Sequence, residues 1–175
     1  MMSVALIVID LQTGWLGMSP GLKRSVEEKL SRMCETIKIF RKAGAPVIFT
    51  YHNYIEGDIT PGNRKFDIFP EVEVLESDLK VVKTYQNAFN KTNLAVLLKE
   101  HGCDTVVMIG LSATNCVLST YLGAYDHDLV PYLVKGAVAG QDDTSVITAE
   151  RLCDTLSVRA VSQLLGQDWK TIKMH

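Results

Sequence analysis

The residue with the strongest chemical potential in this sequence is Cys116. It follows an apolar run at residues 106–109 and a break of small residues, and it opens a segment with helical periodicity. A thiol in the first turn of a helix faces unpaired backbone N–H groups and the positive end of the helix dipole, which favour the reactive thiolate. Taken alone, a buried cysteine is more often a small apolar side chain. Chemistry at Cys116 therefore requires partners from elsewhere in the chain.

Two ionisable residues stand at comparable places. Asp10 follows the apolar run 4–9, and Lys83 ends the run 78–83. A carboxylate can take the proton of a thiol, and an ammonium group near the sulfur lowers a cysteine pKa from ~8.5 to about 3.5–7.5. Taken singly, Asp10 could equally be a helix cap or turn residue and Lys83 a solvated lysine. Together with Cys116 they predict a nucleophile, its base and a stabilising cation.

Predicted strands and helices alternate along the chain, and these elements must position the three residues. Apolar, β-branched runs predict strands at 4–9, 46–51, 78–83, 103–109 and 129–134, and amphipathic periodicity predicts helices at 22–43, 90–101, 116–127 and 146–165. This alternation indicates a three-layer α/β/α sandwich with a mostly parallel central sheet. Because ligands bind at the carboxyl ends of such strands, Asp10, Lys83 and Cys116 are expected at one edge of the sheet.

The remaining segments are less regular. Residues 53–79 contain Gly and Pro without a sustained period, which is typical of a functional loop, either a lid or a subunit interface. Residues 135–145 are expected to form a loop, and the last ten residues have no assignment. Cys34 is expected on or beside the buried stripe of its helix. The final helix is expected to present five apolar residues to the core, namely Ile147, Leu152, Leu156, Val161 and Leu164.

Composition limits the classes of function. The chain has 175 residues, of which 47% are hydrophobic, so a single domain at 1–175 is expected. The net charge of −2 and the absence of a basic stripe argue against nucleic acid as a partner. The apolar start is too short to span a membrane, and four distant cysteines suggest neither disulfides nor a zinc knuckle, so a cytoplasmic protein is expected. Without Gly-x-Gly-x-x-Gly or a P-loop, dinucleotide and P-loop nucleotide binding lose support.

Three stretches of the sequence resemble the isochorismatase-like cysteine hydrolases, which include nicotinamidases, N-carbamoylsarcosine amidases and isochorismatases. These stretches are residues 5–12, 82–94 and 110–117, and the likeness spans nearly the whole chain. The resemblance implies that Asp10, Lys83 and Cys116 form a catalytic triad. It also implies a cis peptide bond between Leu111 and Ser112 and an oxyanion hole formed by the backbone N–H groups of Ser112 and Cys116.

The metal motif of nicotinamidases is not matched. Those enzymes have Asp-x-His after the second strand and a later histidine, whereas residues 51–54 here read Tyr-His-Asn-Tyr and the next histidine is His101. One histidine is too few for a zinc site, so neither a metal nor another cofactor is expected. His52 then either contacts the substrate or shapes the pocket. The presence of Cys116 also argues against isochorismatase proper, whose vinyl-ether hydrolysis needs no thiol.

The function predicted is hydrolysis of the C–N bond of a small amide or carbamoyl compound through a thioester. The expected pocket residues are Trp15, His52, Tyr54, Tyr85 and Asn87. The resemblance further implies a homo-oligomer, either a dimer or a tetramer. The alternatives are a catalytically inert small-ligand or interaction protein on the same fold, a nicotinamidase without its metal cage, and a redox-sensing thiol protein.

Overall fold

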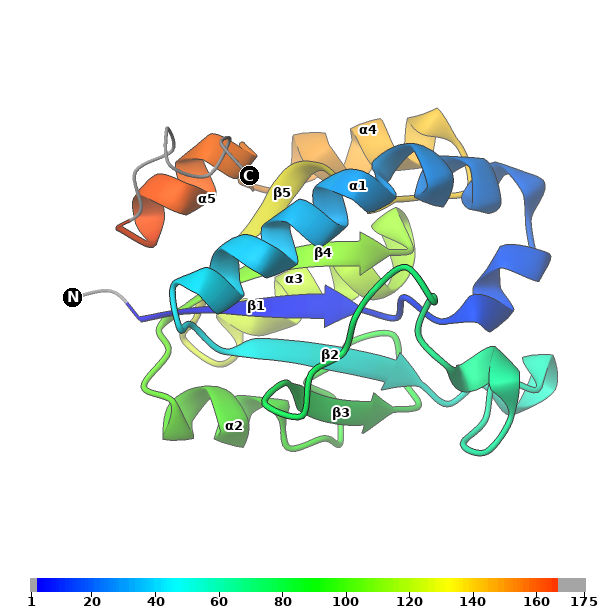
Figure 1. Ribbon diagram of the computed structural model, residues 1–175, viewed down its shortest axis with the longest axis horizontal. Helices are drawn as coiled ribbons and strands as arrows, with labels where there is room; N and C mark the ends of the chain where they lie inside the picture. Colours follow the sequence, from blue (N-terminus) through cyan, green and yellow to red (C-terminus); the bar gives the residue numbers. More distant parts are fainter. Residues whose placement is uncertain (1–2, 167–175) are drawn as a thin grey trace.

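A single parallel sheet forms the centre of the computed structural model, which describes residues 3–166. Its strand order is β3-β2-β1-β4-β5-β6, and each neighbouring pair runs parallel. The carboxyl ends of the first four strands point to the same side of the molecule (Figure 1). The strands are β1 (Val4–Ile9), β2 (Val47–His52), β3 (Leu79–Lys83), β4 (Thr105–Leu111), β5 (Val130–Ala139) and β6 (Thr155–Leu156).

Helices cover both faces of the sheet. One apolar core lies beneath α1 and α5 and contains Phe40 and Val161, and a second lies beneath α2, α3 and α4 and contains Leu98, Tyr121 and Ala149. The predicted three-layer α/β/α sandwich is therefore confirmed. The helices are α1 (Pro20–Lys42), α2 (Leu94–Glu100), α3 (Leu118–Tyr125), α4 (Asp143–Leu152) and α5 (Val158–Leu164).

Helix α1 is the longest helix among the described residues and is well specified locally. The Ser19 side chain caps it by accepting a hydrogen bond from the Leu22 amide, and Pro20 occupies the first turn, where it costs no hydrogen bond. Its apolar residues recur at helical spacing and face the sheet. Cys34 is partly buried and packs against this core, as expected.

The predicted helix 146–165 is wrong because the chain changes faces within it. Helix α4 ends at Leu152, the short strand β6 pairs with β5, and Ser157 caps a separate helix α5. Because α4 and α5 pack on opposite faces of the sheet, one continuous helix cannot bury both. Ile147 and Leu152 accordingly point to solvent, at 49% and 65% exposure, whereas Leu156, Val161 and Leu164 contact the core beneath α1 and α5.

Two other boundaries differ from the prediction. Strand β5 continues to Ala139 through part of the predicted loop 135–145, because residues 137–139 are buried and pair with the end of β4 beyond a register shift. Helix α2 begins at Leu94 rather than at residue 90, since the preceding residues form turns around Asn87 and Thr92.

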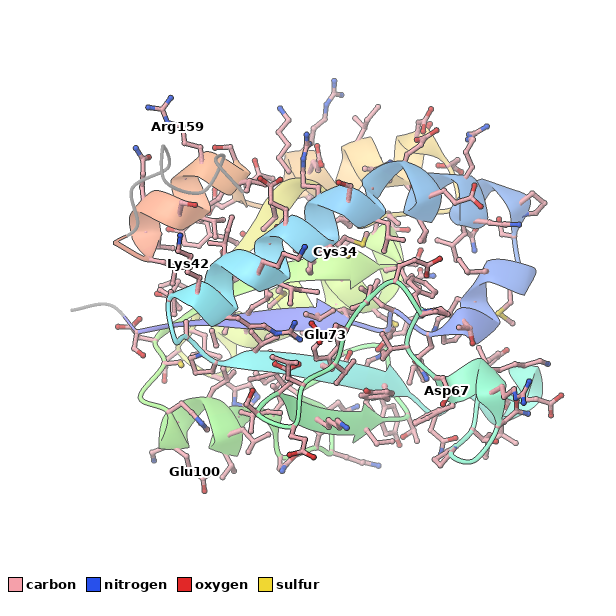
Figure 2. All side chains as sticks on the ribbon, in the orientation of Figure 1. Cys34, Lys42, Asp67, Glu73, Glu100 and Arg159 are labelled. Carbon is pink, nitrogen blue, oxygen red and sulfur yellow. The ribbon has the colours of Figure 1, made fainter. Side chains whose placement is uncertain are left out.

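The long segment 53–79 is anchored to its own chain. Phe69 and Val72 are buried in the core beneath α1, and Arg41 of α1 forms ion pairs with Asp78 and Glu73. Figure 2 shows Glu73 beside α1, close to the labelled Cys34. Two short 3₁₀ turns, η2 (Ile55–Gly57) and η3 (Arg64–Phe66), interrupt the segment. None of the described helices is long and apolar enough to cross a membrane. The last nine of the ten unassigned C-terminal residues lie outside the described part.

Glycine at position 110 allows β4 to lie close against the end of β1. Its φ is +121°, and a Cβ atom there would lie 2.2 Å from the Ile9 carbonyl oxygen. Backbone atoms cannot move aside as a flexible side chain can. The Gly110 backbone therefore determines how closely β4 approaches the end of β1, next to Asp10.

Replacing Gly110 by Ala is expected to lower the free energy of unfolding by about 3 kcal/mol, because it combines an unfavourable φ with a backbone clash. The matched control is Gly44→Ala, where φ is +65° but no atom lies within 4 Å, so the expected loss is only about 1 kcal/mol. Urea unfolding followed by circular dichroism measures both losses. Equal losses in the two variants would contradict this role of Gly110.

Candidate active site

The carboxyl ends of four strands bring the candidate residues together. Asp10 directly follows β1, His52 ends β2, Lys83 ends β3, and Cys116 follows β4 after a short turn. Asp10 has a φ of 53°, which turns the chain out of the strand, and its amide contacts the Thr50 carbonyl of the neighbouring strand. The three residues predicted to do chemistry, Asp10, Lys83 and Cys116, therefore lie at one edge of the sheet.

A buried ion pair joins Asp10 to Lys83. The distance from Lys83 Nζ to Asp10 Oδ2 is 2.7 Å, and the two side chains are 0% and 1% exposed. The Thr50 hydroxyl donates a 2.6 Å hydrogen bond to the other carboxylate oxygen, Oδ1. Such a pair is tolerated in the interior only when each charge has good partners. The ion pair links the carboxyl ends of β1 and β3, which lie on either side of β2.

The Lys83 ammonium group also contacts the sulfur. Its Nζ atom lies 3.3 Å from Cys116 Sγ, 3.1 Å from His52 Nδ1 and 3.2 Å from the Tyr85 carbonyl oxygen. With Asp10, these are four acceptors for three N–H donors, so the protons of Lys83 are shared among them. The ammonium group is the centre of the site, because it contacts the side chains of Asp10, His52 and Cys116 at once.

Neighbouring residues fix both the backbone and the ring of His52. The Gln12 side chain accepts a hydrogen bond from the His52 amide at 2.8 Å and donates one to the His52 carbonyl at 3.2 Å. Trp15 and Tyr54 pack around the ring, with centroid distances of 5.6 and 6.2 Å. Because Lys83 has only donors, Nδ1 must accept from it, which assigns the proton of the neutral ring to Nε2.

Cys116 lies in a π-helical turn, η4 (Ala113–Val117), that joins β4 to α3. It therefore precedes the α-helix instead of opening it, which corrects the sequence-based placement. The Leu111–Ser112 peptide bond is cis. The Ser112 carbonyl accepts hydrogen bonds from the amides of Asn115 and Val117, at 3.0 and 3.2 Å, on either side of the Cys116 amide.

Burial and charge set the protonation of the acid and the thiol in opposite directions. Burial disfavours the Asp10 carboxylate, but the Lys83 charge and hydrogen bonds from Lys83 and Thr50 outweigh it and lower the pKa of Asp10. Burial and the Asp10 charge raise the pKa of Cys116 to about 12, against the opposing effect of Lys83. The expectation of a lowered cysteine pKa is therefore wrong, and the resting pair is a carboxylate and a thiol.

A cavity of about 290 Å³ opens beside the thiol. Of the predicted pocket residues, Trp15, His52 and Tyr54 line it, and Tyr85 and Asn87 do not. The Tyr85 hydroxyl instead accepts from Lys91 in solvent, and only the Tyr85 carbonyl faces Lys83. The Asn87 side chain accepts from the Phe89 amide and packs against α3 at Gly123.

Sequence reasoning missed several residues of the cavity. The neutral amides Gln86, Asn115 and Gln141 line it, as do the apolar side chains Leu22 and Leu111. Gln86 lies between Tyr85 and Asn87, so the sequence predicts the correct loop but the wrong residues within it. Asn115 directly precedes Cys116, and that adjacency was the available signal. Gln141 gave no signal because its loop follows the unexpected extension of β5.

The donor atoms of Asp10, His52 and Cys116 lie within 4.8 Å of one another, a spacing that a metal ion could bridge. However, Lys83 Nζ contacts a donor atom of each, at 2.7, 3.1 and 3.3 Å. An ammonium group already supplies the positive charge there, and a divalent cation would be strongly repelled by it. These residues therefore do not fit a metal centre.

Comparison with known proteins identifies the family of this chain. The family model "Isochorismatase domain" matches residues 4–152. The chain belongs to the isochorismatase family. It is 30% identical to the isochorismatase family protein YrdC of Bacillus subtilis over 80% of this chain and 78% of that protein. It is 32% identical to Nicotinamidase 3 of Arabidopsis thaliana over 69% of this chain and 65% of that protein.

The solved structures extend the likeness to the fold. N-carbamoylsarcosine amidase from Thermoplasma acidophilum matches with a TM-score of 0.74 and 24% identity, covering 90% of this chain and 97% of that one. The family contains amidohydrolases, so the prediction of a hydrolase of this family is confirmed.

The protonation of Cys116 predicts slow alkylation at neutral pH. Because burial and Asp10 raise its pKa to about 12, the rate of iodoacetamide labelling should keep rising with pH through 10. Peptide mapping by mass spectrometry separates Cys116 from the other three cysteines. A labelling rate that levels off below pH 8.5 would show a thiolate at neutral pH and contradict the assignment.

Proposed function

We propose that this protein is a cysteine amidase that hydrolyses the C–N bond of a small amide or carbamoyl compound through a thioester. The observation that supports this most strongly is the contact of one buried ammonium group, Lys83, with both the Asp10 carboxylate and the Cys116 sulfur. Nucleophile, base and cation are thereby adjacent, next to a cavity that a small molecule can occupy. The relatives named nicotinamidase and N-carbamoylsarcosine amidase add support.

In the acylation step, Cys116 Sγ attacks the substrate carbonyl carbon while its proton passes to Asp10. The raised pKa of Cys116 and the lowered pKa of Asp10 make this transfer unfavourable before the C–S bond forms. Proton transfer and attack are therefore coupled, and Lys83 stabilises the charge that develops on sulfur. The protonated Asp10 then gives the proton to the departing nitrogen, the C–N bond breaks, and ammonia or an amine leaves.

The carbonyl oxygen becomes negatively charged during attack and needs donors. The backbone N–H groups of Ser112 and Cys116 are proposed to supply them, since both belong to the turn that carries the nucleophile. In the deacylation step, Asp10 takes a proton from water as the oxygen attacks the thioester. The C–S bond breaks, the proton returns to sulfur, and a carboxylic acid is released.

His52 is proposed to act through the hydrogen bonds of its ring. Its Nδ1 accepts from Lys83 at 3.1 Å, which restricts the orientation of the ammonium group between Asp10 and Cys116. The ring also lines the cavity, where Nε2–H is available to a substrate acceptor. His52 is therefore a positioning residue for Lys83 as well as part of the pocket.

Replacing Cys116 by Ala is expected to abolish ammonia release from any amide that the protein hydrolyses, because the nucleophile is lost. An ammonia-release screen over small amides identifies the substrate, and intact mass spectrometry of the acid-quenched protein should detect the acyl group on Cys116. Asp10→Asn should accumulate no adduct, because it cannot accept the thiol proton. Turnover by the Cys116→Ala variant at the rate of the unmodified protein would overturn the proposal.

Two substitutions separate the chemical role of His52 from its volume. His52→Phe keeps a flat ring but removes the acceptor, and should lower kcat/KM about tenfold or more, in line with the loss of one hydrogen bond to a charged group. His52→Gln retains an acceptor and should recover part of that loss. Steady-state kinetics with the identified substrate measures both. If His52→Phe has full activity, the ring only shapes the pocket.

A further inference from the structure

We infer that the substrate carries no negative charge and is an uncharged, largely apolar amide. This inference rests on the proposed amidase function and specifies its substrate class. The supporting observation is the charge of the cavity wall. Among the described residues, no Lys or Arg lines the cavity, and the only carboxylate there belongs to Asp10.

The cation that contacts the catalytic groups, Lys83, is not available to a ligand. The Lys83 side chain is fully buried and lies 2.7 Å from the Asp10 carboxylate, with which it already forms an ion pair. A substrate carboxylate would therefore enter a partly enclosed cavity without a cationic partner and close to the Asp10 carboxylate. Burying an unpaired charge is far more costly than burying a neutral group of the same size.

The amino terminus of α1 reaches the cavity through Ser19 and Leu22 but does not replace a cation. The amides of Leu22 and Lys23 already donate to the Ser19 hydroxyl and carbonyl oxygens, at 3.3 and 3.0 Å. The Gln141 carbonyl oxygen also lies against the first turn, only 2.0 Å from where a Cβ of Gly21 would be. A carbonyl dipole at that place disfavours an anion.

The remaining wall suits a flat, neutral acyl group. Trp15 and Tyr54 stack at 5.7 Å between ring centroids, with an interplanar angle of 25°. Leu22 and Leu111 add apolar surface. The cavity wall also carries the neutral side-chain amides of Gln86, Asn115 and Gln141. These groups can form hydrogen bonds with a neutral substrate.

Matched amides that differ by one carboxylate test this inference. The pairs are benzamide with 4-carboxybenzamide, and maleamide with maleamate. Isothermal titration calorimetry on the Cys116→Ala variant measures binding without turnover, and ammonia release by the unmodified protein measures the reaction. In both pairs the uncharged amide should bind at least about tenfold more tightly, and should be the member that is hydrolysed.

The outcomes are distinguishable. Tighter binding of the carboxylate in either pair, or no binding of either uncharged amide, overturns the inference. Preferential binding of uncharged amides without ammonia release from any of them supports the charge preference but overturns the amidase reaction. Hydrolysis that favours the carboxylates supports the amidase reaction and overturns the charge preference.

A variant with a new cation tests the cause. Met18 lines the cavity and is 53% exposed, so a longer charged side chain can be placed there. Met18→Arg should reduce the preference for the uncharged member about tenfold, whereas Met18→Leu should leave the preference unchanged. If Met18→Arg prefers the uncharged amide as strongly as the unmodified protein does, the lack of a cation in the cavity wall does not cause the preference, and the inference is overturned.

Discussion

The ion pair between Lys83 and Asp10 is the interaction on which the site depends. It connects the ends of β1 and β3 across β2, and both side chains are removed from water. Removing one partner of such a pair leaves an unpaired buried charge and costs about 3–5 kcal/mol. The surrounding structure satisfies the pair, with Thr50 on the carboxylate and with His52 and the Tyr85 carbonyl on the ammonium group.

This pair also decides how the thiol can react. Burial of the thiol and the Asp10 charge together outweigh the effect of Lys83 at the sulfur, so the pKa of Cys116 is raised. A resting thiol resists alkylation and oxidation, which both require the thiolate. In the proposed mechanism, the sulfur becomes nucleophilic only when a carbonyl carbon is in place and the thiol proton can move to Asp10. The low reactivity of the resting thiol and the proposed catalytic role of Asp10 then have the same physical origin.

Much of the fold followed from local sequence patterns. Residues 4–9 are all buried and form β1 at the predicted bounds, and parallel strands necessarily bring Asp10, His52 and Lys83 to one edge. The division of the last predicted helix did not follow, because α4 and α5 both have helical periodicity and the two residues of β6 are too few to recognise. Periodicity reveals a buried stripe but not which face of the sheet buries it.

The site itself was predictable in its residue types but not in its electrostatics. A helix terminus and a nearby lysine suggested a lowered cysteine pKa, and the opposite direction results from burial and from the place of Asp10. Those effects depend on distances between strands remote in sequence. Likewise, Gln141 reaches the cavity only because β5 extends to Ala139, so no local pattern identifies it.

The resting site holds a carboxylate and a thiol whose pKa values are coupled. The most direct test is a thiolate titration by ultraviolet absorbance near 240 nm, taken as the difference from Cys116→Ala, in the unmodified protein and in Asp10→Asn. We expect no Cys116 thiolate below about pH 10 in the unmodified protein, and a Cys116 pKa lowered by about one unit or more once the Asp10 charge is removed. A thiolate already present at pH 7, or a titration unchanged in Asp10→Asn, would contradict it.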